Sequence, residues 1–332
     1  MTSPVFDKPV RAEQRSETRL NDVIRKPGIA HVSLTLAACS LSMGAILLTR
    51  GTGDVAAVWP VNAILLIVVL KWPKAEWPSL FGCLFIGTLL ANVVIGDPWV
   101  RSLILAIANS LEVLIVALIL SQHSAPNITR KSGILRLFAA SLVACSISTP
   151  IALAGLAMTG AALPVQDSAL WFFGDILGLL LFAPLLWALL TKRETGNDLG
   201  WMSVLEGLLV VVVTIGVFVQ SSYPLLFLVP PVLVPLTFRH GVRGAAVALL
   251  VVTMISIGFT YAGMGPTMLA EGGIVHHMLV LQAFLAANSY MALSLGASVS
   301  ERHRLNQRLS DSRRRVVERS AREKVLLRQA EM

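Results

Sequence analysis

Two acidic residues lie deep inside apolar stretches of this sequence, where an ionised carboxylate would be costly. Glu112 occurs in ANSLEVLIVAL and Asp175 in WFFGDILGLLLFAP. A carboxylate at the centre of a bilayer costs roughly 2.5–3.5 kcal/mol, so each acid should face protein or water and have a partner. A third acid, Glu206, is only about two residues inside its apolar run and is interpreted as a charge that reaches the membrane rim.

Asparagine residues occur at depths similar to those of the two acids. Counting 1.5 Å per residue from the outer end of each run places Asn62 and Asp175 about 10 Å deep, and Asn92, Asn109 and Glu112 about 5, 13 and 18 Å deep. Such a cluster could bind a small ligand, because convergent polar groups in an apolar cleft fix a ligand's orientation. The alternative is that these groups hydrogen-bond between helices and serve only packing.

The candidate residues also include two tryptophans near the outer ends of their runs. The residues predicted to bind a ligand or to take part in signalling are Trp59, Asn62, Asn92, Asn109, Glu112, Trp171 and Asp175. Gly174 and Gly178 form a GxxxG pair around Asp175, which is predicted to permit close helix packing.

The elements that must position these residues are membrane helices. The chain has 332 residues, of which 55% are hydrophobic and 14% charged, and its mean hydropathy is +0.73. The apolar residues gather in runs of about 15 to 25 residues. Such runs favour helices over barrel strands, since a bilayer core of about 30 Å needs roughly 20 apolar residues per helix. We therefore expect an all-α polytopic bundle of about ten transmembrane helices, eight to ten because the second and eighth runs are short and contain proline. The expected spans are 29–48, 55–70, 78–95, 103–120, 134–156, 169–190, 204–219, 224–238, 242–261 and 274–298.

The Lys and Arg residues indicate which side of the membrane each loop occupies. With a cytoplasmic N-terminus, only Arg50 and Arg101 of the 27 basic residues fall outside. This asymmetry predicts a multi-pass protein of the bacterial inner membrane with both termini in the cytoplasm. It also explains the net charge of +8 through membrane topology and anionic lipid, without nucleic-acid binding.

The sequence lacks the residue patterns that metal, redox and catalytic sites require. Cys39, Cys83 and Cys145 lie inside predicted helices without CxxC spacing, so no metal or redox site is expected and we interpret them as packing residues. No nucleophile and base pair or phosphate-binding loop is visible, so neither a cofactor nor catalysis by this chain is predicted.

The last 34 residues differ in character from the apolar runs. The final span continues without Gly or Pro into SERHRLNQRLSDSRRRVVERSAREKVLLRQAEM, which predicts one long cytoplasmic helix. An apolar seam predicts a coiled coil and a homodimer, and the alternative is a basic helix near the lipid surface. The seam consists of Leu305, Leu309, Ser312, Val316, Arg319, Glu323, Leu326 and Ala330. The expected organisation is a cytoplasmic tail (1–28), a transmembrane sensory domain (29–298) and a helical linker (299–332) leading to an effector domain.

The order of several motifs resembles the bacterial membrane-associated sensor domain of class one. The motifs are VWPVNAILLIVVL, WPSLFGCLFIGTLLANVV, ANSLEVLIVALIL, WFFGDILGLLLFAPLLW and YPLLFLVPPVLVPLTFRHGVRGAAVALLVV, followed by the exit helix, over about residues 30–310. The resemblance implies a sensory input module fused to a cytoplasmic histidine kinase or to a diguanylate cyclase and phosphodiesterase pair. The sequence itself contains no GGDEF, EAL or phospho-acceptor histidine box.

Three hypotheses follow from these features. The first is a sensory module in which a small molecule, a membrane protein or the state of the lipid bilayer biases two packings of the helices. The second is a small-solute or ion-coupled transporter, favoured by the buried acids and the proline-rich eighth run. The third is a membrane protein that binds another membrane component.

Overall fold

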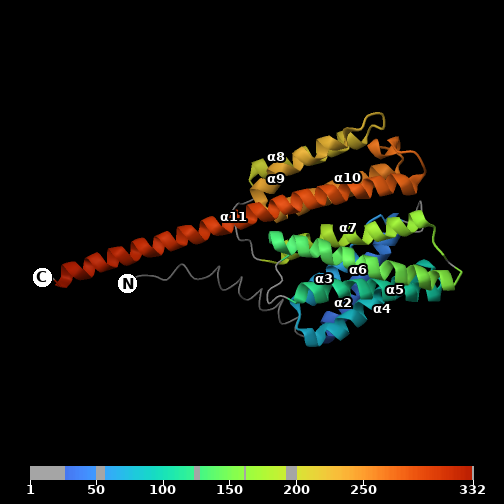
Figure 1. Ribbon diagram of the computed structural model, residues 1–332, viewed down its shortest axis with the longest axis horizontal. Coiled ribbons are helices and arrows are strands. Elements are labelled where there is room, and N and C mark those ends of the chain that lie inside the picture. The colour runs from blue at the N-terminus through green and yellow to red at the C-terminus, as the bar shows by residue number, and fades with distance from the viewer. Residues whose placement is uncertain (1–26, 50–56, 123–127, 161, 192–199, 331–332) are drawn as a thin grey trace, which may run out of the picture. The chain divides into compact units, whose positions relative to one another are not determined.

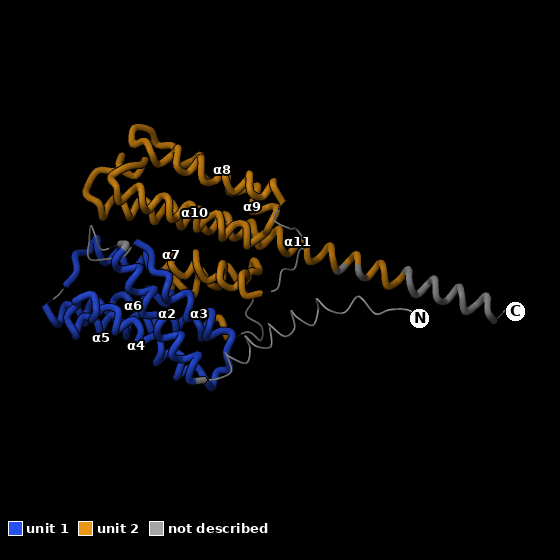
Figure 2. Tube along the Cα trace, turned by 180° about the vertical axis from the view of Figure 1, so that it is seen from behind, with its two compact units in different colours: residues 1–119, 143–175 blue, residues 120–142, 176–332 orange. Residues whose placement is uncertain are grey.

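The computed structural model describes residues 27–49, 57–122, 128–160, 162–191 and 200–330. Within these ranges every regular element is a helix (Figure 1), as expected for an all-α membrane bundle. The predicted tail at 1–28 lies almost wholly outside the described residues. The chain divides into two compact units, residues 1–119 with 143–175 and residues 120–142 with 176–332 (Figure 2).

The first unit contains the N-terminal helices. Its elements are α2 (Pro27–Thr49), α3 (Val61–Lys71), the 3-10 turn η2 (Lys74–Glu76), α4 (Trp77–Ile95), nearly all of α5 (Trp99–Ser121), residues 143–158 of α6 (Lys131–Met158) and residues 165–175 of α7 (Val165–Leu190). Within this unit α2 packs along α4. Asp175 is the last residue of the unit, and α7 continues beyond it into the second unit.

The second unit contains the C-terminal helices. Besides the remaining parts of α6 and α7, its elements are α8 (Trp201–Phe218), η3 (Leu225–Leu228), α9 (Val229–His240), α10 (Val242–Tyr261), η4 (Pro266–Leu269) and α11 (Ile274–Ala330). Here α10 packs against α8, α9 and α11. The exit helix α11 therefore begins inside a helical bundle before it extends past it.

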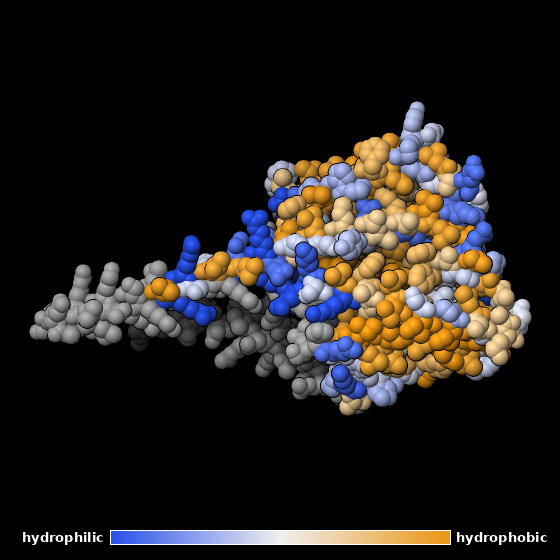
Figure 3. All heavy atoms as spheres, in the orientation of Figure 1, coloured by the Kyte–Doolittle hydropathy of each residue, from blue (hydrophilic) through white to orange (hydrophobic). Residues whose placement is uncertain are grey.

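Each of the ten predicted spans contains a helix, and among the described residues eight helices are long and apolar enough to cross a membrane. The two short apolar segments are residues 61–71 and 225–240, the same two runs that sequence length and proline content had marked as uncertain. Apolar side chains cover much of the visible surface (Figure 3), and Val204, Leu208 and Val212 on α8 are each more than half exposed. Large exposed apolar surfaces are unusual on a soluble protein, so the exposed apolar faces of these helices are suited to contact lipid.

Proline sets the boundaries of the two short segments. The predicted start of the second span, residue 55, lies outside the described residues; residues 57–60 are not helical, and α3 begins at Val61 after Pro60. A residue that precedes proline is disfavoured in the α conformation, and Trp59 is accordingly non-helical. In the eighth segment Pro230 and Pro231 occupy the first turn of α9, where a missing backbone N–H costs nothing.

The exit helix is continuous over 57 residues, from Ile274 to Ala330. At 1.5 Å per residue it is about 85 Å long, which is far more than a bilayer crossing requires. Figure 3 shows hydrophilic side chains gathered where α11 leaves the other helices of its unit. The side chains of the second half of the predicted seam, from Arg319 onward, lie outside the described residues.

Candidate functional site

Glu112 and Asp175 meet inside the first unit. Glu112 on α5 is 1% exposed and Asp175 on α7 is 3% exposed, and the two side chains are hydrogen-bonded to each other. Both residues lie in helices that are long and apolar enough to cross a membrane. The prediction that each acid would have a protein partner therefore holds for this pair, and the partner of each is the other acid.

Asn62 of α3 hydrogen-bonds with two polar residues of α5. Its Nδ2 atom donates to Glu112 Oε1 at 2.9 Å and to Asn109 Oδ1 at 3.0 Å. Asn109 and Glu112 are three residues apart, so they share one face of α5. All three side chains are buried. One amide group of α3 thus joins two consecutive polar groups of the neighbouring helix.

Helices α6 and α7 complete the surroundings of the two carboxyls. Cys145 and Ser148 of α6 hydrogen-bond with Glu112, and Trp171 of α7 hydrogen-bonds with Asp175. Side chains of four helices therefore converge at what we call the carboxyl cluster: Asn62, Asn109, Glu112, Cys145, Ser148, Trp171 and Asp175. The sequence pattern indicated only packing for Cys145 and did not mark Ser148. Their spacing of three residues, which places them on one helix face, is the signal that could have found them.

One polar atom of the carboxyl cluster has no partner. Asn62 Oδ1 is buried and accepts no hydrogen bond from the described residues. An acceptor left without a donor costs about 1–3 kcal/mol when it is buried. The cluster therefore keeps an open acceptor beside Glu112.

Two of the predicted site residues, Asn92 and Trp59, make their hydrogen bonds outside the carboxyl cluster. The Nδ2 atom of Asn92 donates to Thr88 O at 2.8 Å, a bond within its own helix α4. The backbone N–H of Trp59 donates to Gly174 O at 3.2 Å, while its buried indole N–H has no partner among the described residues. Gly174 and Gly178 are both buried, and this bond brings the chain before α3 against the backbone of α7.

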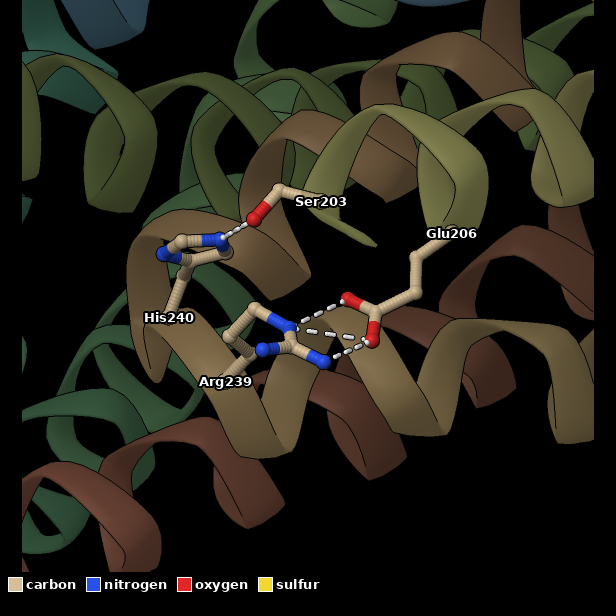
Figure 4. A network of polar contacts seen from close by, with 4 residues as sticks. All are labelled: Ser203, Glu206, Arg239 and His240. Carbon is tan, nitrogen blue, oxygen red and sulfur yellow. Dashed lines mark hydrogen bonds and ion pairs between the residues drawn. The ribbon is translucent and has the colours of Figure 1, made fainter. Parts of the chain in front are cut away.

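A second set of polar contacts lies in the other unit, where α8 meets the end of α9 (Figure 4). Arg239 donates to Glu206 in a fork, with its Nε 2.9 and 3.0 Å and its Nη2 2.7 Å from the carboxylate oxygens. This hydrogen bonding raises the pKa of Arg239 above its ordinary value, so the guanidinium stays charged. Glu206 is thus held by an ion pair, which the sequence interpretation of a charge at the membrane rim had not included.

The neighbouring residues form the corner between α9 and α10. Ser203 Oγ and His240 Nε2 are 2.8 Å apart (Figure 4), and Gly241 follows with a positive φ of 60°. A Cβ atom at Gly296 of α11 would lie 2.9 Å from the carbonyl of Gly241, which is closer than such atoms approach. The corner and the exit helix therefore touch through their backbones.

Arg243, in the first turn of α10, binds the C-terminal end of α7. Its Nε donates to Ala188 O at 2.6 Å, and its Nη2 donates to Thr191 O. The last carbonyls of a helix lack partners within the helix and carry partial negative charge, so a guanidinium there is stabilising. The helix that carries Asp175 is thus tied at its far end to α10.

A protein-family model with the description MASE1 matches residues 30–303, which is most of the chain. The chain belongs to the MASE1 family. The match includes the carboxyl cluster, the corner between α9 and α10 and the membrane part of α11. No curated protein and no solved structure gives a significant match.

MASE1 is a membrane sensory domain of signalling proteins and is not itself catalytic. The chain is accordingly a multi-pass membrane sensory module, which agrees with the first of the three sequence hypotheses. Within the described ranges, no group of three or more His, Cys, Asp and Glu side chains is arranged to hold a metal ion.

Proposed function

We propose that this MASE1 domain is the input of a bacterial signalling protein in which the carboxyl cluster is the switching site and α11 leads to a cytoplasmic output. The output is a diguanylate cyclase and phosphodiesterase pair or a histidine kinase. The observation that carries the proposal is the buried Glu112–Asp175 pair, which joins α5 to α7. Ionisable groups are costly inside a membrane and are retained there mainly for function.

A switch needs two states that the stimulus distinguishes. A ligand that binds both states equally shifts nothing, whatever its affinity. The carboxyl cluster can provide such a difference, because any polar group that enters it must replace or add hydrogen bonds at Asn62, Glu112 or Asp175. A rearrangement of these bonds would change the distance between helices that the cluster now joins.

A physical route for the change begins with α7. Asp175 and Ala188 lie 13 residues apart on this helix, about 20 Å at 1.5 Å per residue. Arg243 binds the end of α7 and belongs to α10, whose preceding corner touches α11 at Gly296. A shift of α7 along its axis would thus act on the corner that holds the exit helix. The alternative packings of these helices are the bistable element that the proposal requires.

Dimerisation through α11 is part of the proposal. Leu305, Leu309 and Val316 are 53%, 61% and 63% exposed on the part of the helix that extends past the bundle. Their spacing of four and seven residues places them on one seam, the pattern of a coiled coil. A second copy would bury this seam, and a rotation of paired exit helices could then control the attached enzyme. The distribution of Lys and Arg supports an inner-membrane location with both termini in the cytoplasm.

The test of the switching site is a fusion of a diguanylate cyclase after residue 332. Glu112→Gln and Asp175→Asn preserve size while they change the charge or the proton that joins the pair. We expect Glu112→Gln to change the basal cyclic di-GMP level about fivefold or more, the lower end of typical coupling between sites, and Asp175→Asn to remove the response of that level to the stimulus. Asp167→Asn, at the start of the same helix α7, is the matched control and should leave the level unchanged. Folded variants at the membrane with the wild-type cyclic di-GMP level and the wild-type response would remove the carboxyl cluster from the mechanism.

The contact between the corner and α11 gives a second prediction for the same fusion. Gly296→Ala places a Cβ atom 2.9 Å from Gly241 and from the nitrogen of Val242, so the exit helix must move away from the corner. We expect the basal output to change about fivefold, as for Glu112→Gln. The matched control is Gly258→Ala on α10, where an added Cβ meets nothing within 4 Å. An output that is the same in both variants and in the parent fusion would contradict transmission through this contact.

A further inference from the structure

We infer that the Glu112–Asp175 pair is a proton-binding site, and that the proton is the stimulus of the proposed switch. The second part rests on the proposed function, whereas the first concerns the carboxyl cluster alone. The inference starts from the placement of two carboxyl groups that are nearly fully buried and interact side chain to side chain. Two carboxyl groups that share a buried site cannot both be ionised without strong repulsion, so one of them holds a proton.

The neighbours of Glu112 decide which acid carries that proton. Asn62 Nδ2 donates to Glu112 Oε1 at 2.9 Å, and the hydroxyl of Ser148 and the thiol of Cys145 also hydrogen-bond with this carboxyl. A carboxylate surrounded by donors is stabilised in its charged form. Glu112 is therefore the acceptor, and Asp175 carries the shared proton and donates it to Glu112.

The second carboxyl has a different environment. Trp171 hydrogen-bonds with Asp175 through its indole N–H, which can only donate. One oxygen of Asp175 accepts the hydrogen bond from Trp171, and the other oxygen carries the proton that faces Glu112. The pair therefore holds one proton, on Asp175, and one negative charge, on Glu112.

No cation is among the partners that surround the pair on the helices packed around it. The groups facing it are the Asn62 amide from α3, the Asn109 amide from α5, Cys145 and Ser148 from α6, and Trp171 from α7. Among these the thiol of Cys145 is the one other titratable group. Loss of the shared proton would therefore leave two adjacent negative charges with no cation among the described residues that contact them, and their repulsion would push α5 and α7 apart.

The open acceptor of Asn62 is the second observation that points to this ligand. Asn62 Oδ1 is fully buried and unpartnered, while the nitrogen of the same amide is bonded to Glu112. It can therefore accept from an O–H donor that arrives beside the pair, such as a water molecule that delivers or removes the proton. A water molecule held between this oxygen and the carboxyl pair would provide the path by which a proton enters or leaves the buried site.

The chain offers a variant that imitates the proton-loaded state. In Asp175→Asn the amide N–H can still donate to Glu112, but it cannot be lost as the pH rises. This variant should keep α5 and α7 joined at every pH. Asp167→Asn removes one carboxyl from the same helix outside the carboxyl cluster and serves as the matched control.

Infrared difference spectroscopy of the purified full chain in lipid nanodiscs tests proton binding directly. Between acidic and alkaline buffer, the wild type should lose the carbonyl band of a protonated carboxyl and gain carboxylate bands. Asp167→Asn should show this change as well, and Asp175→Asn should lack it. The same difference spectrum in the wild type and in Asp175→Asn would overturn the inference.

The cyclase fusion separates this inference from the proposed function. With the cytoplasmic pH held constant, a change of external pH should alter the wild-type cyclic di-GMP level about fivefold, and the Asp175→Asn level should stay constant. An infrared titration without any effect on output would overturn the proton as the stimulus while the binding site stands. An output that depends on Glu112 and Asp175 without an infrared titration would overturn the proton site and support the switching site alone.

Discussion

Gly87→Ala is expected to lower the free energy of unfolding by about 1–3 kcal/mol, the usual cost of overpacking a well-packed contact. A Cβ atom at Gly87 of α4 would lie 2.7 Å from the Cβ of Ala38 and 2.7 Å from the carbonyl oxygen of Thr35, both on α2. These atoms belong to, or are directly bonded to, the backbone of α2. They cannot rotate away, so α2 and α4 would have to separate along their shared face.

Gly82→Ala on the same helix should have the opposite sign. An added Cβ at Gly82 meets nothing within 4 Å, and alanine is favoured over glycine inside a helix by about 0.5–1 kcal/mol. The measurement is unfolding of the purified protein in detergent by titration with a denaturing surfactant. If the two substitutions changed stability in the same direction and by similar amounts, the close contact of α2 with α4 would be wrong.

Asn62→Leu is expected to cost about 1.5–3 kcal/mol, the range for a hydrogen bond to a charged group. Leucine has the same branched arrangement of side-chain heavy atoms as asparagine and a larger volume, so no cavity forms. The loss comes from Glu112 Oε1 and Asn109 Oδ1, which both accept from the Asn62 amide. In the cyclase fusion the same variant should shift the basal output, because it detaches α3 from the carboxyl cluster.

Asn92→Leu is the matched control for this prediction. Asn92 is also an asparagine buried in a membrane helix, but its amide donates to Thr88 O within α4. We expect it to cost less than about 1.5 kcal/mol, the upper end for one ordinary hydrogen bond. Stability is measured by the same surfactant titration. Equal losses for the two asparagines would show that the bonds of Asn62 to α5 carry no special energy.

A double variant shows where the energy of Asn62 resides. Replacing both partners of a buried hydrogen bond by apolar groups can be nearly neutral, whereas replacing one leaves the other unsatisfied. Asn62→Leu combined with Glu112→Leu should therefore lose less stability than the sum of the two single variants. Strict additivity in this cycle would contradict a direct energetic coupling across α3 and α5.

The membrane class and most of the helix boundaries could be predicted from the sequence. In hydrocarbon a backbone must satisfy its own hydrogen bonds, so long apolar runs form helices and their ends follow charge and proline. Residues 57–60 belong to a predicted span but are not helical, because the effect of Pro60 on the preceding residues outweighed the apolar composition. The same reasoning marked Glu112 and Asp175, since an acid inside an apolar run is costly without a partner.

Which polar residues meet was decided only by the tertiary structure. Asn62 and Asn92 look alike in the sequence, yet one bonds to another helix and the other to its own. A membrane helix that is apolar on every side has no stripe to show which face is buried, so its rotation about its axis is not readable from the pattern. The bond from Asn62 to Glu112, 50 residues away, and that from Arg239 to Glu206, 33 residues away, depend on this rotation. The sequence by itself determined that the helices span a membrane and that two acids inside them need partners, and packing between helices decided what those partners are.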